Sequence, residues 1–224
     1  MARNVAKVVA ILNQKGGVGK TTTAVLLATQ FQELFPKLKV ALADADPQLS
    51  ASGWIERGPE KERIPTFVVA KDREGVDLKA ELDGIDADVI ILDLPPGLAS
   101  VSLRGALFAT LIIVPVGPSP VDLDASARAI GICKEVASYK SDSQFILVPV
   151  RVRHNTAMGR ELQSTLGQIG PVSKTSIVLR EDYAKCFAKG VGVNTYSPGS
   201  AAHQEAGLLA EEIAAILKLG VGHV

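Results

Sequence analysis

The stretch of sequence that decides the fold is residues 13–23, which read Asn13-Gln14-Lys15-Gly16-Gly17-Val18-Gly19-Lys20-Thr21-Thr22-Thr23. An apolar run at residues 8–12 leads into it, and a helix-like stretch at residues 24–35 follows it. A strand, a glycine-rich turn and a helix in this order are the context that a Walker A phosphate loop requires. Glycines let the backbone approach a polyphosphate, and the curled amides with the positive end of the next helix form an anion site. These residues predict a nucleotide-binding site.

Two side chains of this loop have roles that follow from their chemistry. Lys20 can reach the β- and γ-phosphates as a point charge, and the Thr21 hydroxyl can bind Mg2+. A glycine-rich turn without a ligand is the alternative, and the Lys-Thr pair in register with the glycines disfavours it. The loop residues that we expect to contact the nucleotide are Gly16, Gly17, Val18, Gly19, Lys20, Thr21 and Thr22.

A second lysine, Lys15, stands just before the glycines and adds positive charge beside the same phosphates. The sequence Lys-Gly-Gly-Val-Gly-Lys-Thr-Thr at residues 15–22 resembles the deviant Walker A motif of the ParA/MinD family of P-loop ATPases. The resemblance implies that ATP and Mg2+ are the cofactors. It also implies that Lys15 reaches across a nucleotide-sandwich homodimer to the partner's ATP and acts with Lys20 in catalysis. A solvated loop lysine is the plainer alternative.

Carboxylates end two of the expected strands. Residues 39–43 form an apolar run that ends at Asp44 and Asp46, and residues 88–92 form another that ends at Asp93 in a Walker B arrangement. Ligands of open α/β sheets bind at the carboxyl ends of the strands. We therefore expect Asp93 to hold Mg2+ directly or through water.

The segment Asp-Ala-Asp-Pro-Gln at residues 44–48 also resembles the family's pattern. By that resemblance Asp46 orients the attacking water, Asp44 lies in the Mg2+ region, and residues 94–97, Leu-Pro-Pro-Gly, form a loop that senses the nucleotide state. A carboxylate can position water and accept its proton while cations stabilise the charge on phosphate. The alternative for either aspartate is capping of a helix at residues 49–55.

The second half of the chain gives weaker signals. Apolar runs predict strands at residues 110–116, 144–150 and 172–179, and we expect helices between them at residues 125–138 and 155–168. The sequence Pro-Ser-Pro-Val-Asp-Leu at residues 118–123 resembles the small ParF-like partition ATPases, in which this region contributes to the dimer face. Helix capping by Asp122 or Asp124 is the alternative there. The resemblance to the ParA/MinD family makes Arg151, just beyond the strand at residues 144–150, a candidate for contacting adenine.

Composition limits the possible partners. With 47% hydrophobic and 21% charged residues, the 224-residue chain suits one domain, residues 1–224. Its 24 basic and 24 acidic residues cancel, so any DNA contact must come from a local patch. The two cysteines form no Cys-x-x-Cys pair, and no apolar run approaches the roughly 20 residues of a membrane span. We expect a cytoplasmic protein without a membrane partner.

Strand and helix signals alternate, which predicts an α/β fold with one doubly wound, mostly parallel twisted sheet and helices on both faces. The resemblance implies a slow ATPase whose ATP-bound dimer binds nucleoid DNA non-specifically, and a ParB-like or other cargo adaptor that stimulates hydrolysis. Its cargo could be a plasmid, a chromosome or a protein body. Basic residues available for DNA phosphates are Arg180, Lys185 and Lys189, with a second group at Arg151, Arg153, His154 and Arg160 that a solvated surface also explains.

Three other functions remain open. A MinD-like membrane-positioning ATPase is one, although the last helix carries Glu205, Glu211 and Glu212 where a membrane-surface helix needs basic residues. An iron–sulfur carrier or nitrogenase-type reductase is another, but Cys133 and Cys186 do not match its arrangement. An ATP-dependent small-molecule ligase lacks a separate substrate motif.

Overall fold

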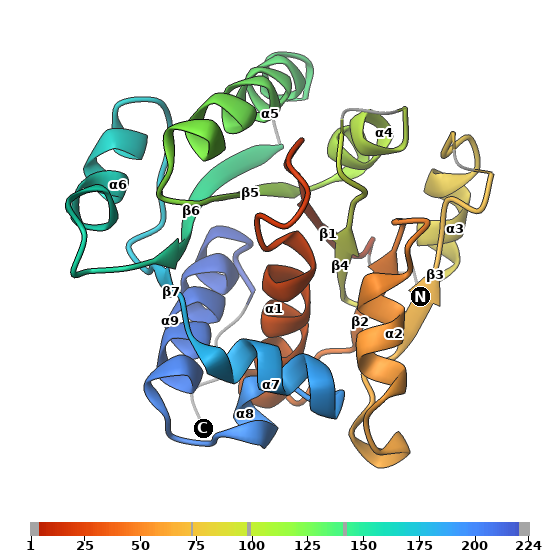
Figure 1. Ribbon diagram of the computed structural model, residues 1–224. Helices are drawn as coiled ribbons and strands as arrows, with labels where there is room; N and C mark the ends of the chain where they lie inside the picture. The colour runs from red at the N-terminus through yellow and green to blue at the C-terminus, as the bar shows by residue number, and fades with distance from the viewer. Residues whose placement is uncertain (1–4, 73, 98–99, 141–142, 220–224) are drawn as a thin grey trace.

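The computed structural model describes residues 5–72, 74–97, 100–140 and 143–219. Within them the strands form a seven-stranded sheet in the order β3-β2-β4-β1-β5-β6-β7, and every pair of neighbours is parallel. Figure 1 shows the helices on both sides of this twisted sheet. The strands are β1 (Lys7–Ile11), β2 (Val40–Asp44), β3 (Thr66–Val68), β4 (Val89–Asp93), β5 (Leu111–Val116), β6 (Gln144–Val152) and β7 (Ile177–Val178). The helices are α1 (Lys20–Leu34), α2 (Ser50–Glu56), α3 (Leu78–Gly84), α4 (Ser100–Phe108), α5 (Pro120–Tyr139), α6 (Ala157–Gly167), α7 (Glu181–Lys189), α8 (Val193–Tyr196), α9 (Ala201–Ile216) and the short 3-10 turn η1 (Glu60–Glu62).

The register of the central strands brings the predicted site residues to one edge of the sheet. Ile11, the last residue of β1, pairs with Asp93 of β4, and Asp93 also pairs with Asp44 of β2. The phosphate loop leaves β1 at the same edge, because it connects Ile11 directly to α1. The doubly wound parallel fold predicted from the sequence is confirmed.

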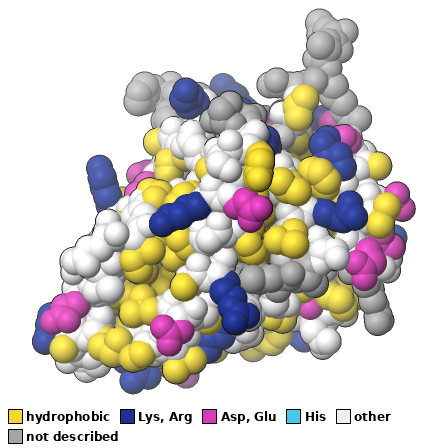
Figure 2. All heavy atoms as spheres, turned by 90° about the horizontal axis from the view of Figure 1, so that it is seen from above, with side chains coloured by type: hydrophobic (Ala, Val, Ile, Leu, Met, Phe, Trp, Pro, Cys, Tyr) yellow, Lys and Arg dark blue, Asp and Glu magenta, His cyan; other side chains and the backbone are white. Residues whose placement is uncertain are grey.

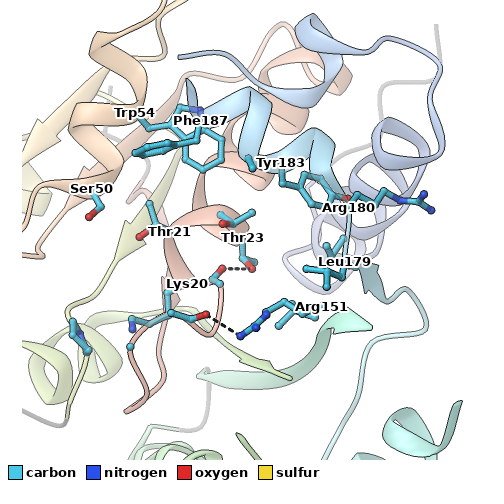
Figure 3. A pocket seen from close by; sticks show the side chains of 18 of the residues that line it. Lys20, Thr21, Thr23, Ser50, Trp54, Arg151, Leu179, Arg180, Tyr183 and Phe187 are labelled. Atoms are coloured by element: carbon cyan, nitrogen blue, oxygen red, sulfur yellow. Dashed lines mark hydrogen bonds between the residues drawn. The ribbon is translucent and has the colours of Figure 1, made fainter. Parts of the chain in front are cut away.

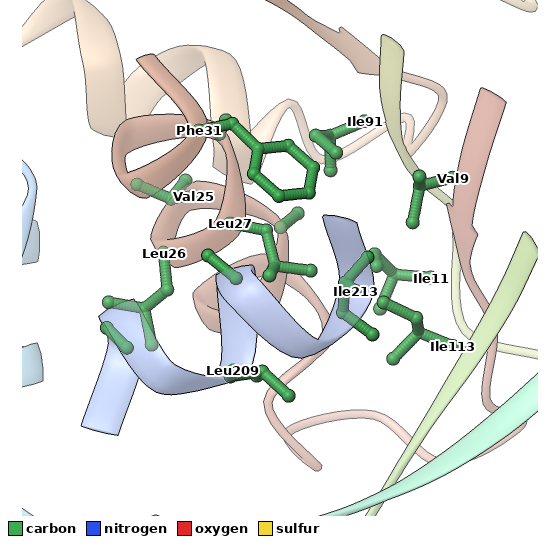
Figure 4. Packing of buried hydrophobic residues seen from close by; sticks show 14 of the residues in the cluster. Val9, Ile11, Val25, Leu26, Leu27, Phe31, Ile91, Ile113, Leu209 and Ile213 are labelled. Atoms are coloured by element: carbon green, nitrogen blue, oxygen red, sulfur yellow. The ribbon is translucent and has the colours of Figure 1, made fainter. Parts of the chain in front are cut away.

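Two apolar layers hold the helices on the sheet. On one face α1 and α9 pack over the strands. Figure 4 shows Leu27 of α1 next to Ile213 of α9, and Phe31 of α1 next to Ile91 of β4. On the other face α3 to α6 cover the alternate strand residues, such as Ala10 and Leu92. The central strands are buried on both faces, as an all-parallel sheet covered by helices requires.

Several element boundaries differ from the predictions. Helix α1 begins at Lys20 rather than near residue 24, and Thr23 is accommodated because its hydroxyl donates to the Gly19 carbonyl at 2.8 Å. The predicted strand at residues 172–179 is wrong over most of its length: only Ile177–Val178 joins the sheet, with one bridge at Val172. The backbone amides of Lys174 and Thr175 instead donate to the Glu212 carboxylate of α9.

Three short helices were not predicted. Helices α3 and α4 have seven and nine residues, and α8 has four. Sequences this short carry little periodicity, and such helices form through tertiary packing rather than intrinsic propensity. No helix in the described part of the chain is long and apolar enough to cross a bilayer.

Candidate nucleotide-binding site

The phosphate loop has the backbone that its glycines predict. Gly17 and Gly19 adopt positive φ angles of 71° and 108°, which side chains of L-residues rarely tolerate. A Cβ atom built on Gly16 or Gly17 would meet no protein atom within 4 Å. The space in front of this loop is therefore open to a ligand, and α1 begins at Lys20 with its amides directed toward that space. The loop forms a cradle that fits a phosphate group.

Two polar side chains meet at the start of α1. The Thr21 hydroxyl donates to Oδ2 of Asp93 at 2.7 Å, while Oδ1 of Asp93 is buried and has no hydrogen-bond partner among the described residues. Burial raises the pKa of Asp93 to about 7, in spite of the Thr21 hydrogen bond, which lowers it. A buried carboxylate oxygen without a partner beside a threonine hydroxyl suits a hydrated Mg2+. No group of three or more metal-binding side chains occurs in the described residues, so such an ion would complete its shell with phosphate oxygens and water.

Lys20 lies at the floor of the cradle. The residue is only 6% exposed, and its Nζ donates to the Lys15 carbonyl at 3.2 Å. Burial lowers the pKa of Lys20, and the charges of Asp93 and Asp46 partly oppose this effect. A buried ammonium group with one carbonyl acceptor among the described residues keeps donor capacity for an anion.

The two aspartates after β2 have different surroundings. Asp44 is fully buried, and its oxygens accept the backbone amides of Asp46 at 3.1 Å and of Ser52 at 2.8 Å. It therefore fixes the loop and the start of α2, which is the capping role considered as an alternative; burial raises its pKa. Asp46 borders the open space, and its Oδ1 accepts the Gln48 amide at 2.9 Å, while no other described residue donates to its carboxylate.

Lys15 contacts its own subunit. Its Nζ donates to Oδ1 of Asp122 at 2.6 Å, and Ser119 donates to Oδ2 of the same carboxylate at 2.5 Å. Burial alone would raise the pKa of Asp122, but the hydrogen bonds from Lys15 and Ser119 outweigh it and lower the pKa. Asn13 supports the loop from below, since its Oδ1 accepts the Lys15 amide and its Nδ2 donates to the Pro115 carbonyl. Sequence reasoning missed Asn13 and the Lys15–Asp122 pair.

A cavity of about 540 Å³ extends from the phosphate loop between α2 and α7, a volume in the range of small-molecule sites. Arg151, with a φ of 56°, borders it and donates to the Gly17 carbonyl at 3.2 Å (Figure 3). Pro96, in the loop predicted to sense the nucleotide, also lines this cavity. The apolar wall was not predicted, and its side chains come from Trp54, Val150, Ile177, Val178, Leu179, Tyr183, Ala184 and Phe187.

The basic residues considered for DNA have contacts of their own. Arg180 extends away from Lys20 toward α9, where its guanidinium group pairs with Glu205 (Figure 3). Lys185 pairs with Glu181 at 3.0 Å, and Arg153 and Arg160 are exposed. Figure 2 views the molecule from above, and the Lys and Arg side chains described there lie singly among hydrophobic and acidic ones. That face carries no continuous basic field over its described residues.

The two cysteines are buried on opposite faces of the sheet. Cys133 of α5 is 1% exposed and Cys186 of α7 is fully buried, and each packs in a different apolar layer. Burial raises the pKa of Cys133 to about 12 and that of Cys186 to about 11, so both stay thiols at neutral pH.

A parallel sheet with a phosphate loop after β1, a Thr–Asp pair beside it and a second lysine in the loop defines a P-loop nucleotide-binding protein of the deviant Walker A type. The model of the CobQ/CobB/MinD/ParA nucleotide-binding domain matches residues 9–212. The chain belongs to this family, and the resemblance noted in the sequence is confirmed.

Individual relatives agree with this assignment. The maintenance of carboxysome distribution protein A of Halothiobacillus neapolitanus is 30% identical over 195 residues, covering 86% of this chain and 89% of the relative. The chromosome-partitioning ATPase Soj of Thermus thermophilus is 31% identical over 163 residues, covering 61% of this chain and 65% of Soj. Two solved structures share the fold, each with a TM-score of 0.76: the ATP complex of a Cyanothece McdA variant, at 17% identity over 97% of this chain and 98% of McdA, and the Mg-ADP complex of Pyrococcus horikoshii MinD, at 18% identity over 98% of this chain and 100% of MinD.

Proposed function

We propose that this chain is an ATPase of the ParA type, which dimerises around two ATP molecules, binds DNA non-specifically and positions a cargo. The observation that carries the proposal is the hydrogen bond between Thr21 and Asp93 beside the phosphate loop. The loop is open at Gly16 and Gly17, and the buried Lys20 ammonium group belongs to the same site. The solved ATP and Mg-ADP complexes of similarly folded proteins support the choice of nucleotide and metal.

Each of the site residues has a separate role in the proposed hydrolysis. The amides of residues 16–22 and the Lys20 ammonium group would hold the phosphates, and Thr21 and Asp93 would hold Mg2+. Asp44 fixes the neighbouring loop. Bound Mg2+ would neutralise charge on the β- and γ-phosphates. Asp46 keeps Oδ2 without a hydrogen bond from any described residue, so this atom can orient a water and accept its proton. ATP and water then yield ADP and phosphate, while Lys20 stabilises the charge on the transferred group.

In the proposal, the Lys15 side chain has one contact in the single subunit and another in the dimer. In the subunit it is held by Asp122 at the rim of the phosphate loop, with its side chain about one third exposed, at 32%. In the proposed dimer its ammonium group leaves Asp122 and contacts the partner's ATP. Val121 is 64% exposed next to Asp122, which suits a surface that a second copy covers.

The proposal for the cargo is supported by the relatives rather than by the site. Relatives named for carboxysome distribution and for chromosome partitioning support a nucleoid-bound positioning function, with an adaptor that is either ParB-like or specific to a protein body. The adaptor would stimulate hydrolysis and release the dimer from DNA. Arg151 is proposed to contact the base side of the nucleotide, because it lies where the cavity leaves the phosphate loop.

The experiment is measurement of the molar mass by light scattering with Mg2+ and no nucleotide, ADP or ATP, together with phosphate release. We expect a dimer with ATP only, slow hydrolysis, and ATP-dependent binding to non-specific duplex DNA that weakens steeply with salt. A chain that stays monomeric at saturating ATP and Mg2+ contradicts the proposal. ATP-dependent sedimentation with anionic liposomes, but not with DNA, would instead support the MinD-like membrane function.

A further inference from the structure

Helices α2 and α7 form the two sides of the cavity and meet over it. Ser50 and Trp54 of α2 line one side, and Tyr183, Ala184 and Phe187 of α7 line the other. In Figure 3 the rings of Trp54 and Phe187 lie against each other, well away from Arg151. The ring centroids are 5.3 Å apart and the planes are nearly perpendicular, at 89°. An edge-to-face arrangement is a favourable geometry for an aromatic pair, so it stabilises the contact between the two helices.

Three further contacts lock the ends of the two helices together. Nε1 of Trp54 donates to the carbonyl of Val191, just after α7, at 3.1 Å. The guanidinium carbon of Arg57 lies 4.4 Å from the centroid of the Phe187 ring. The backbones of Gly58 and Gly190 touch, since a Cβ on Gly58 would fall 2.1 Å from the Gly190 carbonyl oxygen. We call this group the α2–α7 clasp: Trp54, Arg57, Gly58, Phe187, Gly190 and Val191.

The other end of α2 is attached to the candidate catalytic carboxylate. The Gln48 amide donates to Asp46 Oδ1 at 2.9 Å, and the Leu49 amide donates to the Asp46 carbonyl at 2.8 Å. Leu49 then adopts a left-handed φ of 50°, and α2 starts at the next residue. The Ser52 amide is bound by Asp44. With so few free torsions between Asp46 and α2, a displacement of α2 displaces Asp46.

The near end of α7 forms the apolar wall on the base side of the cavity and is anchored to the body of the protein. Arg180 pairs with Glu205 of α9, and the Tyr183 hydroxyl contacts the same carboxylate at 3.3 Å. The preceding residues, Ile177 to Arg180, line the cavity beside Arg151. A planar base beside the phosphate loop would therefore contact the segment that leads into α7.

We propose that the α2–α7 clasp couples the base side of the nucleotide pocket to Asp46, with Trp54 as the positioning residue that joins them. The inference rests on the proposed function, because it concerns hydrolysis at the same site. Its consequence is that the base raises the rate of hydrolysis and not only affinity, since contacts made far from the reacting bond can be used to order the catalytic group. Loss of the Trp54 contact would leave phosphate binding intact and remove this advantage.

The test compares ATP with inorganic triphosphate, which lacks the nucleoside, in single-turnover hydrolysis with Mg2+ at saturation. We expect the wild-type rate with ATP to exceed that with triphosphate by about tenfold or more. In Trp54→Phe, which keeps an aromatic ring and loses the donor to Val191, this ratio should fall at least fivefold, with the triphosphate rate within twofold of wild type. Tyr139→Phe is the matched control, because Tyr139 is 80% exposed on α5 and also loses one polar atom.

Two further measurements test the coupling without relying on Trp54→Phe. Phe187→Leu should reduce the same ratio, and it serves if Trp54→Phe fails to fold. Trp54 is the single tryptophan of the sequence, so the emission of the unmodified protein should change with ADP and stay constant with triphosphate. Equal losses with both substrates, an effect on KM alone, or equal emission changes overturn the coupling. If the unmodified protein hydrolyses neither compound, the proposed function itself fails.

Discussion

Lys15 and Asp122 lie 107 residues apart in the sequence, and their side chains form an ion pair of 2.6 Å within one subunit. The family resemblance assigns Lys15 to the partner's ATP, but in this subunit its ammonium group is already bound to Asp122. The Asp122 side chain is nearly buried, and Ser119 donates to its second oxygen. The carboxylate is therefore held in place by contacts other than the one with Lys15. The intrasubunit pair and the proposed intersubunit contact compete for the same ammonium group.

Asp122→Asn should therefore favour the ATP-bound dimer. An ion pair of this exposure contributes about 1 kcal/mol, so its loss should strengthen dimerisation about fivefold per subunit. The dimer dissociation constant can be measured by analytical ultracentrifugation with ATP in Asp46→Ala chains, which should hydrolyse ATP poorly. Asp124→Asn, on the exposed side of the same helix, is the control, and weaker dimerisation by Asp122→Asn would show that Asp122 presents Lys15 rather than retains it.

The same pair predicts a pH dependence of stability. The pKa of Asp122 is lowered in the folded protein, so its stabilising contribution is present above the unfolded value of 3.8 and is lost as the pH falls through the lower, folded pKa. The difference in unfolding free energy between the wild type and Asp122→Asn should be constant from pH 6 to 8 and shrink below about pH 3.8. Urea unfolding at several pH values measures it, and a difference that grows on acidification contradicts the assignment.

Asp46→Ala should bind ATP and dimerise but hydrolyse it slowly. Removal of a group that orients and deprotonates water lowers rates by about 100-fold or more. Phosphate release and dimer lifetime after dilution of ATP report the two effects. Gln48→Ala is a suitable control, because Gln48 uses only its backbone amide toward Asp46; normal hydrolysis by Asp46→Ala would move the catalytic role elsewhere.

The two lysines of the loop should be separable by substitution. Lys20→Ala removes the charge beneath the cradle and should abolish ATP binding. Lys15→Ala should bind ATP with nearly unchanged affinity and remain a monomer, because its ammonium group faces Asp122 rather than the cradle. Calorimetric titration and light scattering distinguish these results. A Lys15→Ala chain that dimerises normally would refute the contact across the dimer.

Gly190→Ala should destabilise the fold by about 3 kcal/mol. Gly190 has a φ of 72°, and an added Cβ would lie 2.0 Å from the Gly58 nitrogen, so the helix ends must separate. Gly131→Ala is the matched control: Gly131 is in α5, nothing lies within 4 Å of its added Cβ, and a gain of about 0.5–1 kcal/mol is expected. Thermal unfolding of the nucleotide-free protein compares them, and equal effects would contradict the close approach of α2 and α7.

The sequence predicted the parts of the site that are contiguous in the chain. The phosphate loop and the aspartates at the ends of β2 and β4 follow from local patterns, because parallel strands deliver their last residues to one edge. Contacts between distant segments could not be predicted in this way. The Asp122 partner of Lys15, the Trp54–Val191 hydrogen bond and the apolar wall of α7 depend on how helices pack, which no short pattern encodes.

The order of strands also determines when the protein can fold during its synthesis. β1 is made first, but its neighbours in the sheet are β4 and β5, and the apolar side of α1 is covered by α9. At about 5–20 residues per second, the ribosome needs on the order of ten seconds or more to proceed from Phe31 to Leu209, which belong to the same core. During that interval the apolar side of α1 is exposed on the nascent chain. We therefore expect chaperones to bind the unfinished polypeptide there.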